Sequence, residues 1–180
     1  MSVKLRDCEP GLHHVTVGST GPIEYYTDHV DRLDWLRRFI LVVDRHGWKC
    51  LLLCQMTTHV HLILDVPDRS LPEGMQRLNG RYGTEFNARH ERRGALIRRR
   101  YWSKRITTEE QLLATYRYAA LNPVRAGICD RPEEWFWSSF ATSCGIATTF
   151  PFVDATPVLS ALDPTPNATP RMLFGLFDDG

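Results

Sequence analysis

Residues 48–66 read WKCLLLCQMTTHVHLILDV, two apolar and β-prone runs that are separated by the polar pair Thr57-Thr58. This arrangement predicts an antiparallel hairpin whose two strands lie in the centre of a sheet. Because side chains alternate along a strand, His59 and His61 project from one face, and the apolar residues that alternate with them line the other. The hairpin therefore predicts a sheet with one fully apolar face and a pair of histidines on the opposite face.

The segment before the hairpin predicts a strand and a helix. Residues 12–17 form the expected first strand, and an apolar period of 3.6 residues then indicates a helix of about 18 residues. Thr27 or Asp28 caps its start, and Gly47 marks its end. Its expected core positions are Val30, Leu33, Leu36, Phe39, Ile40 and Val43.

Two further helices are predicted after the hairpin. Ser70, with Glu73 three residues later and Pro72 in the first turn, is a capping-box start for a helix that runs to about residue 90. Its expected buried stripe is Met75, Leu78, Tyr82 and Phe86. Residues 94–106 then predict a hairpin or an extended arm. The last helix opens at residue 107 or 108 and stops before Pro123, because proline disfavours a helical residue in front of it.

The composition indicates one ordinary globular domain. The chain has 180 residues, 43% of them hydrophobic and 24% charged, which excludes a disordered or fibrous protein. The apolar runs are too short for a transmembrane helix and the charged N-terminus lacks a signal-peptide core, so we expect a cytoplasmic protein. The five cysteines include no C-x-x-C pair, and Cys50 and Cys54 are expected to share one strand face as buried small hydrophobes.

Prolines recur at short intervals from residue 147 onward. We therefore expect a domain of residues 1–146, followed by a Pro-rich tail of residues 147–180 that is partly ordered at best.

Basic residues are concentrated in one part of the chain. Residues 77–105 contain ten of them against two acidic ones, a net charge of +8 in a chain whose total is +1. Nearly all are arginines, which pair with phosphate and stack on bases, and the pattern favours nucleic-acid contact over a solvated helix face. The ten are Arg77, Arg81, Arg89, Arg92, Arg93, Arg98, Arg99, Arg100, Lys104 and Arg105, and the aromatic residues interleaved with them are Tyr82, Phe86, Tyr101 and Trp102.

The two strand histidines are candidate metal ligands. His59 and His61 can converge on one divalent ion, although two half-buried histidines with local hydrogen bonds fit the same pattern. At about 100° per residue, the core sector of the last helix contains Tyr116, whereas Tyr118 and Asn122 lie one turn apart on another face. That pair suits ordinary interface packing, or a tyrosine nucleophile beside an amide oxygen that binds a hard cation.

Three blocks of sequence carry a family pattern. They are His59-Val60-His61 after a strand, Tyr118-Ala119-Ala120-Leu121-Asn122-Pro123-Val124-Arg125-Ala126-Gly127 in the last helix, and Trp137-Ser138-Ser139-Phe140 downstream. In this order and spacing they resemble the REP-associated tyrosine transposases, which belong to the HUH single-stranded-DNA transposases. Residues 74–82, GMQRLNGRY, also resemble that family's central helix, and the likeness covers about residues 12–145.

The resemblance implies a ferredoxin-like (RRM-like) α+β sandwich, with a central antiparallel sheet and helices on one face. It implies a metal-dependent DNA transposase and endonuclease in which Tyr118 attacks the scissile phosphate, giving a 5′-phosphotyrosine link and a free 3′-hydroxyl. His59, His61 and Asn122 would hold the cofactor, Mg²⁺ or Mn²⁺.

The implied partner is single-stranded DNA with hairpin or repeat elements, contacted by the ten basic residues named above and by Arg125. The protein would be a monomer or a homodimer and would not bind a membrane. It would be cytoplasmic, and associated with the nucleoid when DNA is bound. Whether Tyr118 acts in its own subunit or in a partner's is left open.

The chain departs from the family pattern at three places. Thr57-Thr58 stand where Pro-Asn is usual, Ala119-Ala120 stand where a bulky residue and a histidine are common, and residues 97–101, IRRRY, replace Phe-Gln-Gly-Arg-Tyr. A domesticated, non-catalytic nucleic-acid-binding module of the same fold is therefore a second hypothesis. A sheet-based RNA binder is a third, although the sheet face offers histidines where stacking aromatics would be expected. His14 either reaches the metal from the first strand or is a hydrogen-bonded sheet histidine.

Overall fold

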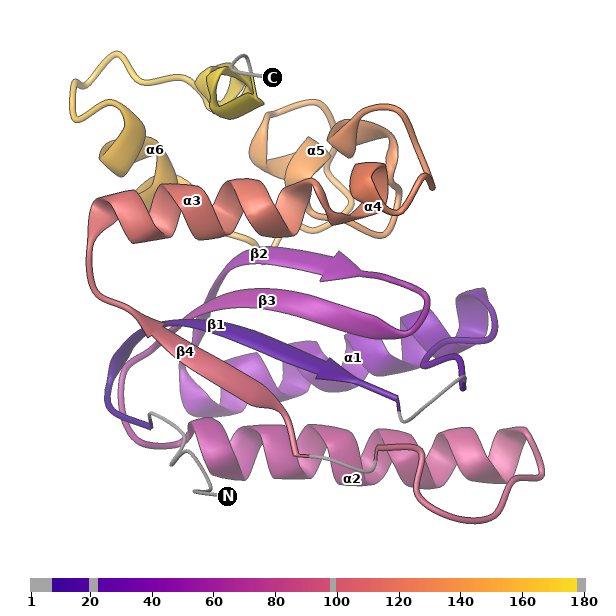
Figure 1. Cartoon of the computed structure of the whole chain (residues 1–180). Helices are drawn as coiled ribbons and strands as arrows, with labels where there is room; N and C mark the ends of the chain where they lie inside the picture. Colours follow the sequence, from indigo (N-terminus) through magenta and orange to yellow (C-terminus); the bar gives the residue numbers. More distant parts are fainter. Residues whose placement is uncertain (1–7, 20–22, 98–99, 178–180) are drawn as a thin grey trace, which may run out of the picture.

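The computed structural model describes residues 8–19, 23–97 and 100–177 of the chain. Four strands form one sheet in the spatial order β2-β3-β1-β4, and every neighbouring pair is antiparallel (Figure 1). With the helices the chain order is βαββαβ, which is the ferredoxin-like arrangement. The predicted α+β class with a central antiparallel sheet is confirmed. The strands are β1 (Gly11–Gly18), β2 (Lys49–Gln55), β3 (His59–Val66) and β4 (Trp102–Ile106).

Helices cover both faces of this sheet rather than the single face that was expected (Figure 1). The apolar face of β3 packs under α1 (His29–His46) and α2 (Leu71–Arg89) and forms the larger core. The histidine face also carries the apolar residues Leu52 and Ile63. They are buried beneath α3 (Glu109–Ala120), which removes their side chains from water. Short helices complete this second layer: α4 (Asn122–Arg125), η1 (Pro132–Glu134), α5 (Phe140–Ser143) and α6 (Thr156–Leu162).

Helix α1 has the predicted bounds but presents a different face to the core. The Asp28 side chain accepts a hydrogen bond from the helix start, and Gly47 ends the helix in the left-handed conformation. Val30 and Leu33, both predicted to be core residues, are each 54% exposed. The buried face is instead centred on Trp35, whose larger ring removes more apolar area from water.

A β-bulge changes the side-chain alternation in β2. The pairing of β2 with β3 shifts register between Cys50 and Leu52. As a result Cys50 packs in the core under α1 and α2, whereas Cys54 pairs with His61 on the opposite face. Both are buried free thiols, as expected, but the prediction that they share one face is wrong.

Helix α2 follows the sequence prediction in its bounds and in its stripe, and differs in its cap. The four predicted stripe residues from Met75 to Phe86 are all buried. Ser70 stands at the N-cap, but its hydroxyl makes no cap hydrogen bond. It accepts a hydrogen bond from Trp48 Nε1 at 2.8 Å instead, so the predicted capping box is replaced by a contact between α2 and the start of β2.

The Pro-rich segment after residue 147 packs against the rest of the chain in its described part. It contains α6 and the 3-10 helix η2 (Pro170–Phe177), with prolines in the first turn of each. Val158 and Leu173 are fully buried in the core beside α3. The segment is therefore better ordered than a loose tail, because its apolar residues complete that core. The domain boundary at residue 146 stays a prediction.

None of the helices in the described ranges combines the length and the apolar character that crossing a lipid bilayer requires.

Candidate functional site

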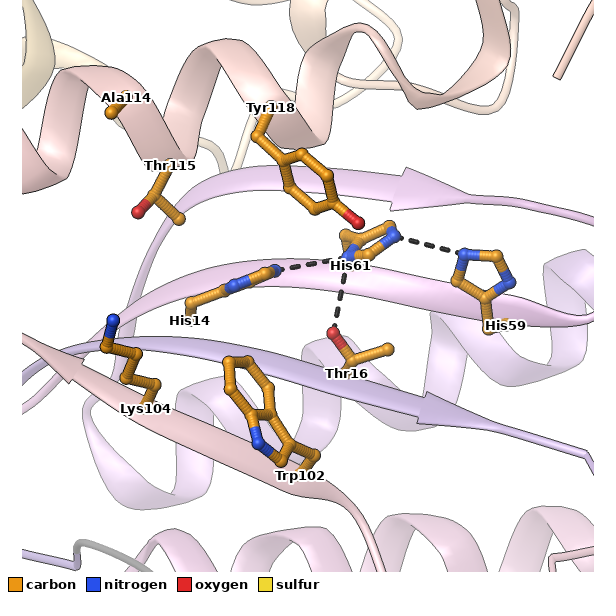
Figure 2. A pocket seen from close by; sticks show the side chains of 9 residues that line it. All are labelled: His14, Thr16, His59, His61, Trp102, Lys104, Ala114, Thr115 and Tyr118. Carbon is orange, nitrogen blue, oxygen red and sulfur yellow. Dashed lines mark hydrogen bonds between the residues drawn. The ribbon is translucent and has the colours of Figure 1, made fainter. Parts of the chain in front are cut away.

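A pocket of about 640 Å³ lies between α3 and the histidine face of the sheet (Figure 2). Strands β1, β3 and β4 form its floor, and α3 forms the wall above them. Helix α3 packs over β2 and β3, which leaves the β1 and β4 side of this face open. The lining residues are His14, Thr16, His59, His61, Trp102, Lys104, Ala114, Thr115 and Tyr118.

Three histidines form a connected row on the floor of the pocket. The Nε2 atoms of His59 and His61 are 3.0 Å apart. On the other side of the His61 ring, Nδ1 lies 3.1 Å from His14 Nε2 and 3.2 Å from the Thr16 hydroxyl. The Thr58 hydroxyl lies 3.0 Å from Nδ1 of His59. His14 therefore contacts the Nδ1 side of the His61 ring, opposite the Nε2 atom that faces His59. It is a hydrogen-bonding partner of that ring and not a third ligand beside the two Nε2 atoms.

Burial keeps these histidines neutral near pH 7. Desolvation lowers the pKa of His61 to about 3, and the neighbouring His59 and His14 add to the effect. The pKa of His14 falls to about 4, mainly by desolvation and secondly through the positive charge of Lys104. Desolvation also lowers the pKa of His59. A neutral imidazole keeps one nitrogen lone pair, which is the form that binds a metal.

The two Nε2 atoms are placed as ligands of one divalent ion would be. Two atoms each about 2.1 Å from a common ion, at an angle of about 90°, lie about 3 Å apart. The Nδ1 atom of His59 faces Thr58, and the Nδ1 atom of His61 faces His14 and Thr16. When Nδ1 carries the proton in both rings, the lone pairs of the two Nε2 atoms point toward each other. In that protonation state a cation between the two atoms would accept both lone pairs, whereas a proton on either Nε2 makes the same 3.0 Å contact a hydrogen bond between the rings (Figure 2).

Asn122 supplies the amide that the sequence predicted. Its Nδ2 donates to the backbone carbonyl of Tyr118 at 2.8 Å, and this bond leaves Oδ1, the atom that suits a hard cation, outside it. The same side chain hydrogen-bonds toward His61, which opposes the lowering of that pKa. Within the described ranges, no three His, Cys, Asp or Glu side chains gather as a metal site. The side chains that could hold a metal here are therefore two imidazoles and one amide.

Tyr118 extends from α3 into the pocket with its hydroxyl toward His61 (Figure 2). Its ring centroid lies 5.6 Å from that of His61 and 6.1 Å from that of His14. Tyr118 is 43% exposed, whereas Tyr116, two residues earlier, is fully buried. The predicted division of α3 into a core face and a pocket face is therefore confirmed.

Two predicted nucleic-acid-binding cations lie at this pocket. Lys104 is part of its lining, and the guanidinium of Arg125 lies over the Tyr118 ring at 5.3 Å from the centroid. These two residues place positive charge beside the Tyr118 ring.

The other predicted cations that the structure describes are not among the residues that line this pocket. Arg77 and Arg81 lie on α2, on the opposite side of the sheet. Arg89 forms ion pairs with Asp28 and Asp31 at the start of α1, and its hydrogen bonds lower the pKa of Asp28 to about 2. The remaining cations are Arg92, which lies over the Phe86 ring, the exposed Arg93, Arg100 and Arg105, and Arg98 and Arg99, which fall outside the described residues.

Trp102 belongs to the pocket, although the sequence pattern grouped it only with the aromatic residues of the basic segment. Of those four, Tyr82, Phe86 and Tyr101 are buried in the core, and Trp102 is 51% exposed. Strand alternation could have grouped Trp102 with Lys104 on one face of β4, and the pairing of β4 with β1 then places them opposite Thr16 and His14. The histidine face therefore does carry an exposed aromatic ring.

Comparison with known proteins finds similarity both in sequence and in structure. No protein-family model matches the chain. A curated protein of Haemophilus influenzae, named "Putative REP-associated tyrosine transposase", is 21% identical over 133 residues, which are 64% of this chain and 71% of that protein. A solved structure of a REP-associated tyrosine transposase bound to a REP hairpin aligns with a TM-score of 0.71 and 16% identity, over 87% of this chain and 94% of the other. The resemblance to the REP-associated tyrosine transposases is therefore confirmed, by sequence in the first protein and by fold in the second.

Proposed function

We propose that this protein is a DNA transposase that cleaves and rejoins single-stranded DNA at hairpin or repeat elements through Tyr118. The observation that carries the proposal is the position of the Tyr118 ring, 5.6 Å from His61 and in the same pocket as the His59 and His61 pair. The two relatives support a transposase that binds DNA, and the solved one was bound to a REP hairpin.

In the proposed reaction, the Tyr118 oxygen forms a bond to phosphorus and the bond from phosphorus to the 3′ oxygen breaks. The phenol loses its proton and the leaving oxygen gains one, so the strand end becomes a free 3′-hydroxyl and the 5′ phosphate stays on the protein. Attack by a 3′-hydroxyl on that link restores the phosphodiester. The energy of the broken bond is kept in the phosphotyrosine, so no nucleotide triphosphate is needed.

His59, His61 and Asn122 would hold Mg²⁺ or Mn²⁺, which polarises the scissile phosphate when it is bound. His14 and Thr16 fix the His61 ring through its Nδ1, and Thr58 does the same for His59. Arg125 places positive charge over the Tyr118 ring, and Lys104 adds a second cation to the same pocket.

The departures from the family pattern leave these groups in place. Ala119 and Ala120 are fully buried in the core beneath α3, whereas Tyr118 faces the pocket. The backbone carbonyl of Thr57 accepts hydrogen bonds from the backbone of Tyr25 and Tyr26, and the Thr58 hydroxyl lies 3.0 Å from His59 Nδ1. Arg98 and Arg99 of the third departure fall outside the described residues. The substitutions at positions 57, 58, 119 and 120 therefore remove neither the proposed nucleophile nor the proposed metal ligands.

A covalent adduct tests the proposal. The protein is incubated with a labelled single-stranded DNA library that contains hairpins, with Mn²⁺ or Mg²⁺, and is run on a denaturing gel. We expect a protein–DNA band that EDTA and Tyr118→Phe abolish and that Tyr116→Phe retains, because the Tyr116 ring is buried away from the pocket. DNA binding without any band under either metal would refute the proposed reaction and favour the non-catalytic hypothesis.

A further inference from the structure

The part of the pocket away from His59 is built by β4. Trp102 and Lys104 are two residues apart and share one face of this strand, because side chains alternate. The register places Trp102 opposite Thr16 and Lys104 opposite His14 on β1, and Thr16 in turn lies opposite His61 on β3. The indole is therefore two strand spacings, about 10 Å, from the strand that carries the proposed metal ligands.

The exposure of Trp102 is unusual for its setting. A half-exposed indole on an edge strand leaves a large apolar surface in water, whereas the neighbouring Tyr101 is buried. Trp102 lines the same pocket as Tyr118, together with Thr115 of α3 (Figure 2). A pocket of about 640 Å³ is within the range that holds a small organic molecule, and one nucleotide is of that size class.

The surroundings hold the indole in one place. Its ring contacts the His14 ring edge-on, with centroids 5.3 Å apart and an interplanar angle of 83°. His14 is itself fixed by its contact with His61. Trp102 is thus positioned relative to the proposed reaction centre by a continuous row of rings, with an exposed cation, Lys104, beside it.

An exposed aromatic ring next to a cation is the arrangement by which proteins bind single strands, with bases stacked on the ring and phosphates paired with the cation. We propose that Trp102 and Lys104 form a nucleotide-binding subsite beside Tyr118, in which a base of the single-stranded DNA stacks on the indole and Lys104 contacts its phosphate. This inference rests on the proposed function, because it takes the strand to pass through the Tyr118 pocket. Base stacking is tolerant of sequence, so the subsite sets the position of the strand more than its identity.

The test is fluorescence anisotropy of a labelled oligodeoxyuridine of about 20 residues, longer than the roughly 4–16 nucleotides that one single-strand-binding fold covers. The full chain is titrated in EDTA, which separates binding from cleavage, at salt concentrations between about 50 and 200 mM. We expect Trp102→Ala to weaken binding at least about five-fold with the same salt slope, and Trp102→Phe to retain most of the affinity. Lys104→Met should reduce the slope of log affinity against log salt by about 0.7, the value for one phosphate contact on a single strand.

Matched controls remove similar groups elsewhere. Leu41→Ala removes an exposed apolar side chain from α1, on the opposite side of the sheet, and Lys49→Met removes an exposed lysine at the start of β2. Both should bind as wild type does. Affinity of Trp102→Ala within about two-fold of wild type, or an unchanged slope for Lys104→Met, would overturn the subsite. Stronger competition by oligouridine of the same length than by unlabelled oligodeoxyuridine would overturn its assignment to DNA.

The outcome is separable from that of the proposed reaction. A Tyr118-dependent adduct together with full-strength binding by Trp102→Ala refutes the subsite alone. Binding that depends on Trp102, without any adduct, refutes the reaction and keeps the subsite.

Discussion

Acidification of the metal-free protein should cost stability through two histidines in particular. The folded state lowers the pKa of His14 to about 4 and that of His61 to about 3, from the ordinary value of 6.5. Above about pH 6.5 both are neutral in the folded and the unfolded chain, so neither contributes a pH dependence. Below about pH 6.5 the two histidines bind protons in the unfolded chain but stay neutral in the folded chain. The free energy of unfolding therefore falls as the pH decreases from about 6.5 toward 4.

The magnitude follows from these pKa values. Each histidine costs about 2 to 3 kcal/mol by about pH 4.5, or about 5 kcal/mol for the two, with a slope approaching 1.4 kcal/mol per pH unit for each. Arg89 lowers the pKa of Asp28 to about 2 from the ordinary value of 3.8, so protonation of Asp28 destabilises the fold only below about pH 4, outside this window. A loss of this size is a large fraction of the typical stability of a domain.

The assay is urea unfolding in EDTA, followed by circular dichroism, at several values between about pH 7 and 4.5. The wild type is compared with the double variant His14→Asn/His61→Asn, which removes both titrating groups and keeps polar side chains. We expect the double variant to lose most of the pH dependence in this interval. Equal slopes for the two proteins would contradict this prediction, because they would mean that neither buried imidazole resists protonation in the fold.

Three further predictions concern the metal site and the packing. Mn²⁺ should raise the melting temperature of the wild type but not that of His61→Ala, since only a folded site binds the ion, and an equal shift in both would contradict the proposed ligand. Gly74→Ala should lower the free energy of unfolding, measured in urea, by about 1–3 kcal/mol, because a Cβ there would lie 2.3 Å from the Trp48 ring. Gly80→Ala is the matched control: it has open space around it and should raise the same free energy by up to about 1 kcal/mol. Ser139→Ala should cost about 1–3 kcal/mol because its hydroxyl accepts from a buried backbone N–H of β2, and wild-type stability would show that water replaces this bond.

The elements that sequence reasoning located well are those with one strong periodic signal. The β2–β3 hairpin, α2 and α3 follow directly from alternation or a 3.6-residue stripe, and the Tyr116 and Tyr118 faces follow from the helix angle. The alternation of side chains along β3 was enough to predict that His59 and His61 share one face of the sheet. Local patterns of this kind need no information from distant parts of the chain.

The features it missed depend on contacts between distant segments. The register shift after Cys50 reverses the alternation of β2, and nothing in the residues themselves marks a bulge. The sequence around Ser70 matches a capping box, but the Ser70 hydroxyl accepts a hydrogen bond from Trp48, which is 22 residues away in the chain. The predicted cap hydrogen bond therefore does not form. Trp102 could be assigned to the pocket only through the pairing of β4 with β1, which is a long-range contact.

All rings of the proposed centre come from one chain: Tyr118 on α3 lies over His61 on β3 of the same molecule. The chain passes from β4 to α3 through a short connection, so the helix that carries the nucleophile is tethered close to the sheet. A centre that is formed within one chain predicts that dilution does not separate Tyr118 from His61. The rate of strand cleavage per molecule should be independent of protein concentration, whereas a nucleophile donated by a second copy would make the rate fall as molecules separate.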